Sequence, residues 1–412
     1  MRFFHIALSY KQHLDAFYGA NPELRASGSY AQIQQALFAD AFNALHLFGE
    51  DMPQFGYASA VAVPNDPVAQ HKWKSEYAPH LKRGPGKDVP PPGAYGKFLT
   101  DDLLEILIEQ VNQFRPDVIY LQDPVGFDGR FLGMLKQRPS LVIGWRAAGI
   151  PKSCEWRDID FLVSNHQPSL DEARRLGVRW QERLLPGFPA WIAGAMRPSD
   201  ERCDVMFAGN VSYEHKTRMR ILTHLAGAPL RSERDISIHY HTDPEPTLPS
   251  GICMLAQRQL WGLEMFQGLR NGRIALNVHI DLAGREAANM RLFEATGAGA
   301  FLLTDHKPNI ADYFEPGREV ETFQTPSEMM EKIFYYLDHP EKRHAIATAG
   351  QQKTLRNFTR EQSSGRLHEL IQRALAAKSS GNRSLEKLAS FFRRGLKSIP
   401  HPAGSSRPRT ES

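Results

Sequence analysis

Short apolar runs alternate with amphipathic helical patterns along the whole chain, and this alternation constrains the fold more than any other feature. The expected strands cover residues 3–9, 118–122, 141–145, 161–164, 204–208, 236–240, 274–279 and 300–304. The expected helices cover residues 30–48, 100–114, 169–176, 215–225, 259–268, 289–296, 326–337 and 341–355. Strands and helices that alternate in this way are typical of parallel α/β units, so we expect an α/β fold.

The length of the chain, 412 residues, exceeds what one ordinary hydrophobic core accommodates, and two domains are the natural expectation. Four turn-forming residues interrupt the pattern near its middle: Pro186, Gly187, Pro189 and Pro198. We therefore predict two doubly wound, Rossmann-like domains, 1–190 and 191–370, that face an interdomain crevice. In such sheets, ligands bind outside the carboxyl ends of the strands.

The remaining segment, 371–412, is basic. From residue 378 onward, eight basic residues stand against two acidic ones, although the whole chain carries only +4. Apolar residues recur here at three- and four-residue steps: Leu385, Leu388, Phe392, Leu396 and Ile399. This pattern predicts a short basic amphipathic helix within 378–399 that lies on an anionic membrane surface. Packing of the same helix against the N-terminal domain is an equally open interpretation.

Composition and charge exclude several classes of protein. A net charge of +4 is too small to indicate a nucleic-acid-binding protein. No uncharged apolar run reaches about 18 residues, and the N-terminus lacks the long apolar region of a secretory signal. The three cysteines, Cys154, Cys203 and Cys253, have neither metal-ligand nor disulfide-framework spacing. We expect a cytoplasmic protein, at most peripheral at the inner face of the membrane.

The Pro- and Gly-rich segment 79–96 is expected to be a surface loop. It is either a loop beside the crevice, on the side that would bind an acceptor substrate, or a plain insertion.

The most informative block is 289–305, where a loop enters a helix, a glycine-containing turn follows, and a buried strand ends the unit. Glu294 falls early in the helix, where a carboxylate can accept hydrogen bonds from both hydroxyls of a ribose. Asn289 and Arg291 flank the helix start, whose free backbone N–H groups suit phosphate oxygens. Asn277 and His279 end the preceding strand and are expected at the mouth of the crevice.

A second group of residues follows the first strand of the C-terminal half. Gly209 and Asn210 form an expected tight turn, and Lys216 and Arg218 lie on the basic helix after it. Both cations can pair with a diphosphate, and they would replace a metal ion in stabilising a diphosphate leaving group. Each of these residues also has a purely structural interpretation. Asp158 and Asp160 have Asp-x-Asp spacing but precede an apolar run, so we expect a turn there and no metal site.

Several segments together resemble the C-terminal domain of CgeB-like (spore maturation protein-like) glycosyltransferases, which are relatives of the group 1 GT-B enzymes: 205–209, 275–280, 289–305, 314–317, 339–343 and 358–366. The N-terminal half resembles them only loosely, through 163–166 and 184–187. The resemblance implies the GT-B fold, with Glu294 on the donor ribose and with Lys216, Arg218 and Arg291 on the diphosphate.

The same resemblance places Glu286 against the donor sugar. The related enzymes usually have a glycine-containing stretch between the two glutamates, whereas here residues 287–293 contain none. Retention of anomeric configuration would accompany Glu286. An inverting enzyme instead needs a general base from the N-terminal half, for which His5, His166 and Asp123 lie at expected strand ends. Glu286 and His166 are therefore the candidate catalytic residues.

Together these features predict a metal-independent glycosyltransferase without a cofactor, whose co-substrate is a nucleotide sugar. The acceptor is a glycan, a lipid-linked molecule or a protein, as in cell-surface glycan biosynthesis. Two other functions remain open on the same architecture. One is another nucleotide-sugar enzyme, such as an epimerase, and the other is a sugar-binding protein without turnover.

Overall fold

The computed structural model describes residues 1–81, 99–228, 235–243, 248–287 and 289–379. Most of the predicted loop 79–96 and nearly all of the predicted amphipathic segment 378–399 lie outside these residues. By its internal contacts the chain forms two compact units, Met1–Glu369 and Leu370–Ser412, and both sheets belong to the first. The predicted domain limits at 190 and 370 stay predictions.

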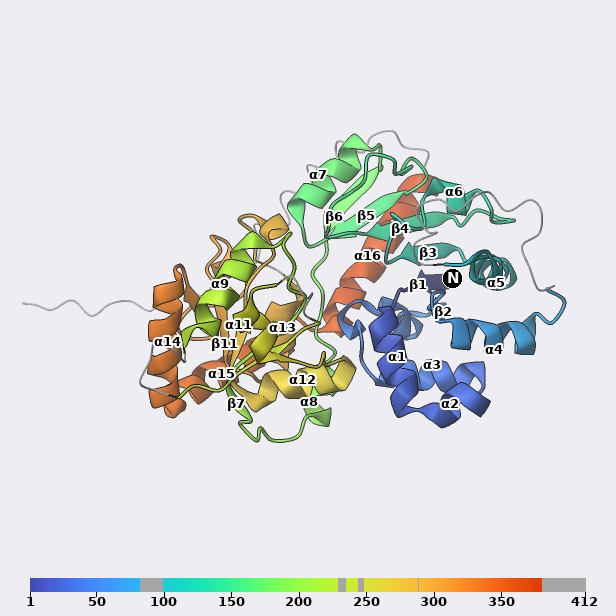
Figure 1. Cartoon of the computed structure of the whole chain (residues 1–412). Helices are drawn as coiled ribbons and strands as arrows, with labels where there is room; N and C mark the ends of the chain where they lie inside the picture. Colours follow the sequence, from blue (N-terminus) through green and yellow to red (C-terminus); the bar gives the residue numbers. More distant parts are fainter. Residues whose placement is uncertain (82–98, 229–234, 244–247, 288, 380–412) are drawn as a thin grey trace, which may run out of the picture. The chain divides into compact units, whose positions relative to one another are not determined.

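Two six-stranded parallel sheets organise the first unit (Figure 1). The first has the order β2-β1-β3-β4-β5-β6, with β1 (Arg2–Ile6), β2 (Ala58–Ala62), β3 (Val118–Leu121), β4 (Leu141–Trp145), β5 (Phe161–Ser164) and β6 (Trp180–Arg183). The second has the order β12-β11-β10-β7-β8-β9, with β7 (Cys203–Ala208), β8 (Ile238–His241), β9 (Ala256–Gln257), β10 (Gly272–Asn277), β11 (Leu302–Asp305) and β12 (Glu321–Phe323).

Helices connect the strands of each sheet. The N-terminal half contains α1 (Lys11–Ala20), α2 (Pro22–Ser27), α3 (Tyr30–Ala39), α4 (Pro67–Tyr77), α5 (Asp101–Phe114), α6 (Gly129–Leu132), α7 (Gln167–Arg175) and α8 (Ala190–Ala195). The C-terminal half contains α9 (Lys216–Ala226), α11 (Ser250–Leu255), α12 (Gly262–Asn271), α13 (Met290–Gly297), α14 (Pro326–Asp338), α15 (Pro340–Asn357) and α16 (Arg360–Ser379). Short 3-10 turns include η1 (Ala44–His46), η2 (Phe48–Glu50), η3 (Met52–Phe55), η5 (Asp281–Ala283) and η6 (Ile310–Asp312).

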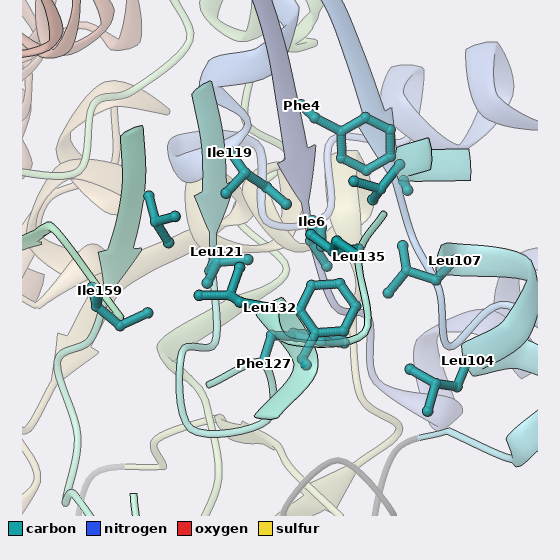
Figure 2. Packing of buried hydrophobic residues seen from close by; sticks show 14 of the residues in the cluster. Phe4, Ile6, Leu104, Leu107, Ile119, Leu121, Phe127, Leu132, Leu135 and Ile159 are labelled. Carbon is teal, nitrogen blue, oxygen red and sulfur yellow. The ribbon is translucent and has the colours of Figure 1, made fainter. Parts of the chain in front are cut away.

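Helix α5 illustrates how the sequence builds these layers. The Thr100 hydroxyl accepts a hydrogen bond from the Leu103 amide and caps the helix start. The helix ends at Arg115, whose φ of 49° is left-handed. Its apolar stripe packs on the sheet, and Figure 2 shows side chains of α5, β1 and β3 gathered in one cluster: Phe4, Ile6, Leu104, Leu107, Ile119 and Leu121. Burial of this stripe stabilises the first sheet by the hydrophobic effect.

The strand order of each sheet contains one topological switch point. In the second sheet, β7 and β10 are neighbours, and the chain proceeds outward from them in opposite directions. In the first sheet the same reversal occurs between β1 and β3. Ligands of doubly wound sheets bind at the carboxyl ends of the strands that flank such a point. Residues after β7 and β10, and after β1 and β3, are therefore the places to look for ligand-binding groups.

The expected α/β class and the two doubly wound sheets are confirmed. The expected helix 30–48 is wrong in length, because α3 ends at Ala39 and 3-10 turns follow. Ala41 and Asn43 have positive φ values of 67° and 56°, which a continuing α-helix does not allow. Strands β2, β6, β9 and β12 were not expected. In the described part of the chain, no helix is both long enough and apolar enough to cross a membrane.

Candidate functional site

The candidate site lies where β7 and β10 end, at the switch point of the second sheet. Gly209 and Asn210 follow β7. Asn277 is the last residue of β10, and His279 lies two residues after it. The Gly209 amide donates to the His241 carbonyl at 3.2 Å, which ties this turn to the end of β8. The predicted residues after both strands thus share one edge of the sheet.

Glu294 is the most buried acidic group of the predicted site. It is 8% exposed, in the middle of α13, and its Oε2 lies 2.9 Å from Nη1 of Arg291. Burial raises the pKa of Glu294, and the neighbouring Arg291 opposes this effect. Arg291 also donates to the Ala208 carbonyl at 3.0 Å and to the Met265 sulfur at 2.9 Å. The guanidinium therefore links the end of β7, α12 and α13.

The start of α13 is held by an amide pair. Asn289 occupies the N-cap position in an extended conformation, and its side chain makes no capping hydrogen bond. Its Nδ2 donates to Oδ1 of Asn277 at 2.9 Å, and Asn277 in turn donates to Thr304 Oγ1 at 2.9 Å. The side chain that usually satisfies the first amides of a helix is thus turned toward β10. This arrangement leaves the start of α13 suited to an anion.

His279 and Asp305 form a buried pair beside these residues. Oδ1 of Asp305 accepts from both the amide and Nδ1 of His279, at 2.8 and 2.7 Å. Burial alone would raise the pKa of Asp305, but the hydrogen bonds from His279 bring it below its usual value. Because an ionised carboxylate only accepts, Nδ1 carries a proton. Nε2 is buried and has no hydrogen-bond partner among the described residues, so it can hydrogen-bond to a ligand hydroxyl.

The two predicted cations of α9 occupy different environments. Lys216, the first residue of α9, is exposed. Arg218 is 9% exposed and donates to the Val278 carbonyl at 2.9 and 2.7 Å and to the Asn210 carbonyl at 2.8 Å. Burial, with Arg291 nearby, lowers the pKa of Arg218 to about 10. Arg218 therefore anchors the loops after β7 and β10, with some of its five N–H donors committed to backbone.

The structure brings the two candidate catalytic residues into one network. Glu286 Oε2 lies 3.0 Å from Nη2 of Arg183 and 3.5 Å from the amide of Gln167. His166, the residue before Gln167, contacts the Leu282 carbonyl through Nε2 at 3.2 Å and Ser169 Oγ through Nδ1 at 2.9 Å. Because a carbonyl only accepts, Nε2 carries a proton, and Nδ1 is hydrogen-bonded with the Ser169 hydroxyl. Both ring nitrogens are thus engaged in this state.

Sequence reasoning missed Arg183, which connects the two halves at this point. Its Nη2 also donates to Tyr313 Oη at 2.9 Å and to the Asn165 carbonyl at 3.1 Å. Arg183 ends β6, a strand that was not expected because only Trp180 in it is apolar. No sequence signal distinguishes Arg183 from the basic residues on neighbouring surface helices.

The other residues singled out in the sequence have local roles. Burial lowers the pKa of His5 to about 3, with His46 and Arg360 contributing, so His5 stays neutral near neutral pH. Asp123 pairs with Arg146 at 3.1 Å. Asp158 and Asp160 precede β5, as expected, and Asp160 Oδ2 accepts from the Val142 amide at 2.9 Å. The described residues contain no group of three or more His, Cys, Asp or Glu side chains arranged to hold a metal ion.

A cavity of about 580 Å³ lies between α12 and β7–β9. It is lined partly by Arg197, Arg202, His239, His241 and Arg258. Arg202 pairs with Asp200 and Arg258 with Glu264, so much of this charge is neutralised locally. The predicted site residues are not among those that line this cavity in the described part of the chain. The candidate site is therefore assigned from the switch-point geometry and not from this cavity.

Part of the chain matches a known protein family. Residues 197–370 match a family described as glycosyl transferase-like, and this segment contains β7–β12 and the whole switch point. No curated protein sequence matches the chain.

Solved structures resemble the fold over most of the chain. Sucrose-phosphate synthase from Thermosynechococcus elongatus has a TM-score of 0.55 at 13% identity, with 92% of this chain and 100% of that chain covered. HepE from Anabaena, bound to UDP and glucose, has a TM-score of 0.56 at 11% identity, with 90% and 100% covered. A glycosyltransferase from Rickettsia africae has a TM-score of 0.56 at 8% identity, with 91% and 98% covered. The chain thus has the GT-B fold, and its glycosyl transferase-like segment on this fold supports glycosyltransferase activity.

Proposed function

We propose that this protein moves a sugar from a nucleotide-sugar donor to a glycan, lipid-linked or protein acceptor. The observation that carries the proposal is the buried Glu294–Arg291 pair beside the uncapped start of α13, at the switch point of the second sheet. In the proposed donor site, Glu294 accepts hydrogen bonds from the ribose hydroxyls. The first amides of α13 bind the diphosphate, and Arg291 lies near them. A neighbour in fold, HepE, has been solved in complex with UDP and glucose.

The remaining predicted residues complete this assignment. His279 Nε2 hydrogen-bonds to a hydroxyl of the nucleotide-sugar donor, and Asn277 orients Asn289 at the helix start. Lys216 and Arg218 add positive charge on the diphosphate side, as does Arg291, so we propose transfer without a metal ion or cofactor. Glu286, held by Arg183, contacts the donor sugar, and His166 lies beside it.

Binding of nucleotides tests the donor site directly. The melting temperature is measured with UDP, GDP, dTDP and CMP in EDTA, and again with Mg²⁺ or Mn²⁺. A nucleotide at 100 times its dissociation constant adds about 2.7 kcal/mol of stability. We expect one nucleotide to stabilise the wild type equally with and without metal, and to stabilise Glu294→Gln by no more than about half as much. Glu315→Gln, which removes an exposed glutamate paired with Arg318, is the matched control and should respond as the wild type does.

Transfer is then measured with the matching nucleotide sugar. Stabilisation of Glu294→Gln equal to that of the wild type would refute the ribose assignment. Nucleotide binding without release of nucleotide in the presence of any acceptor would favour the sugar-binding protein, and conversion of the donor sugar alone would favour the epimerase.

We further propose that the enzyme works in the cytoplasm and that residues 378–399 contact the inner face of the membrane, where a lipid-linked acceptor is presented. Co-sedimentation with vesicles containing anionic lipid compares the full chain with a chain that lacks 378–412. The membrane contact requires binding that falls with added salt and with removal of this segment. Equal sedimentation of both chains would contradict it.

A further inference from the structure

The first sheet has its own switch point, between β1 and β3, and the predicted donor residues leave it unused. Directly after β1 come Ser9, Tyr10 and His13, of which His13 lies on α1. The Leu8 amide in the same turn bonds to the Gln122 side chain after β3 at 3.2 Å, so the two strand ends meet here. A doubly wound sheet binds ligands at this position.

A group of side chains converges on this turn, and we call it the aromatic–carboxylate cluster: Tyr10, His13, Asp40, Phe42 and Trp261. The His13 ring stacks on Phe42 with centroids 4.1 Å apart. Trp261 lies 5.5 Å from Phe42 and 5.9 Å from Tyr10. Tyr10 is 63% exposed, so the cluster opens to solvent on that side.

The carboxylate of Asp40 is held in place with one oxygen available. Nδ1 of His13 is 2.7 Å from Ser9 Oγ, and its Nε2 is 2.8 Å from Asp40 Oδ2. His13 is almost fully buried, whereas the Asp40 side chain is 28% exposed. Within the described residues Oδ1 of Asp40 makes no hydrogen bond to protein. A buried histidine that orients a partly exposed carboxylate is an arrangement for binding a hydroxyl.

The backbone of α12 packs tightly against Asp40 and helps to fix the position of its carboxylate. Gly262 has a φ of +51°, and a Cβ atom there would lie 2.2 Å from Asp40 Oδ2. The Asp40 carbonyl accepts from the Leu263 amide at 2.7 Å, so the start of α12 is fastened to the end of α3. Only glycine fits between them without displacing the carboxylate.

The aromatic–carboxylate cluster lies close to the donor site. The Met265 amide bonds to the Trp261 carbonyl at 3.1 Å, one turn of α12 away, or about 5.4 Å along the helix. The Met265 sulfur contacts Arg291, the partner of Glu294. One helical turn and one arginine side chain therefore separate Trp261 from the residue assigned to the donor ribose.

We propose that the aromatic–carboxylate cluster is the acceptor site and that the acceptor presents a sugar ring to it. This inference rests on the proposed function. Aromatic faces pack against the apolar C–H face of a pyranose, while a fixed carboxylate accepts hydrogen bonds from its hydroxyls. A protein or purely lipid acceptor does not offer this combination. Asp40 binds the sugar hydroxyl, Tyr10 and Trp261 cover the ring, and His13 and Ser9 position the carboxylate.

The test measures binding of methyl glycosides of glucose, galactose, mannose and N-acetylglucosamine by saturation-transfer NMR, with UDP or the best nucleotide present. We expect at least one glycoside to bind the wild type. Tyr10→Ala and Asp40→Asn should each weaken it about tenfold and leave the nucleotide-induced rise in melting temperature unchanged. Trp191→Ala removes an exposed tryptophan of α8, outside the cluster, and should change neither measurement.

Absence of glycoside binding to the wild type, or equal binding by Tyr10→Ala, Asp40→Asn and the wild type, would overturn the inference. This failure differs from failure of the proposed function. If nucleotides bind in a Glu294-dependent way while the glycoside result is negative, only the acceptor site is wrong. If glycosides bind through Tyr10 and Asp40 while no nucleotide binds, the donor assignment is wrong and the cluster remains a sugar site.

Discussion

Glu294 combines two properties that compete at a binding site, because it is buried and must be charged to accept two ribose hydroxyls. Burial raises its pKa, and Arg291 only partly offsets this effect. As pH falls through this raised pKa, the carboxyl group becomes neutral and loses hydrogen-bond acceptor capacity. We therefore expect donor affinity to fall on the acid side at a higher pH than an ordinary glutamate would give. The measurement is the dissociation constant of the nucleotide sugar from pH 5 to 8, since its diphosphate diester has no group near neutrality.

The variant Glu294→Gln distinguishes protonation of Glu294 from other effects of low pH on donor binding. A hydrogen bond to a charged group contributes about 1.5–3 kcal/mol, so the variant should bind roughly 10–100-fold more weakly at pH 8. Its affinity should then show no acid limb. An acid limb of the same size in Glu294→Gln would mean that a group other than Glu294 causes the loss of affinity at low pH.

Arg183 is predicted to control turnover more than binding. It holds Glu286 and Tyr313 and belongs to the N-terminal half, away from the ribose residue. We expect Arg183→Ala to lower kcat about tenfold or more while the nucleotide dissociation constant stays within about twofold. Arg183→Lys, which retains the charge, should recover part of kcat. Arg174→Ala on the exposed face of α7 is the control, and an equal loss there would remove the special role of Arg183.

The sequence revealed the site residues that belong to a local pattern, and it missed those that meet only across long sequence separations. Glu294 and Asn289 lie at a helix start and Asn277 at the end of the preceding strand, and local sequence pattern predicts both kinds of position. Arg183, Asp40 and Trp261 act across long separations, as in the 3.0 Å pair of Arg183 with Glu286. One sequence contains no signal for a contact between residues a hundred positions apart, so these groups appear only once the chain is folded.

Among the elements, α13 shows most clearly how packing depends on a missing side chain. Gly297, the last residue of this helix, lies against the ring of Phe188. A Cβ atom at Gly297 would lie 2.4 Å from that ring. Phe188 is fully buried in the core of the second sheet, so it has little room to move.

We therefore predict that Gly297→Ala destabilises the protein by about 1–3 kcal/mol through overpacking, measured by urea unfolding. Gly194→Ala is the matched control, because Gly194 lies in α8 and a Cβ atom there would meet no other atom within 4 Å. Alanine there should be neutral or stabilising by about 0.5–1 kcal/mol. Equal effects of the two substitutions would show that the contact with Phe188 has no energetic weight.

Element prediction succeeded where burial on both faces leaves a continuous apolar run. Strands β4 and β5 have the expected bounds, and each has a run of buried residues. Strand β6 (Trp180–Arg183) is polar and only partly buried, so its sequence resembles a loop. Its pairing with β5 depends on the existing sheet edge and not on its own composition. Edge strands are therefore the elements that pattern analysis misses here.

At the scale of the whole molecule, the segment after α15 returns to the N-terminal half. The Phe188 amide bonds to the Phe358 carbonyl at 2.8 Å, and the Arg360 amide bonds to the Phe188 carbonyl at 3.0 Å. His368 stacks on Phe55 with centroids 5.0 Å apart. The last residues of the first unit thus contact Phe188 and the 3-10 turns that follow α3. These last residues are therefore part of the N-terminal fold.

Arg360 makes the ion pairs that hold the segment after α15 against the N-terminal half. Its side chain is 5% exposed and binds Asp51 through two hydrogen bonds of 2.9 Å and Glu50 through one of 2.7 Å. Arg360→Met leaves two largely buried carboxylates without a cation, and breaking such a pair costs about 3–5 kcal/mol. We expect this loss in urea unfolding at pH 7.5, whereas Arg366→Met, which breaks an exposed pair with Glu369, should cost less than about 0.5 kcal/mol.

The pH dependence of this loss identifies its cause. Burial already raises the pKa of Glu50, and Arg360 is the main group that opposes the rise. Without Arg360 the folded-state pKa lies further above the unfolded value, so the penalty is present at high pH and disappears as pH falls through it. The deficit of Arg360→Met relative to the wild type should therefore shrink between pH 7.5 and pH 5. A deficit that stays constant over this range would indicate that lost packing of the arginine side chain, and not two carboxylates left without a cation, causes the destabilisation.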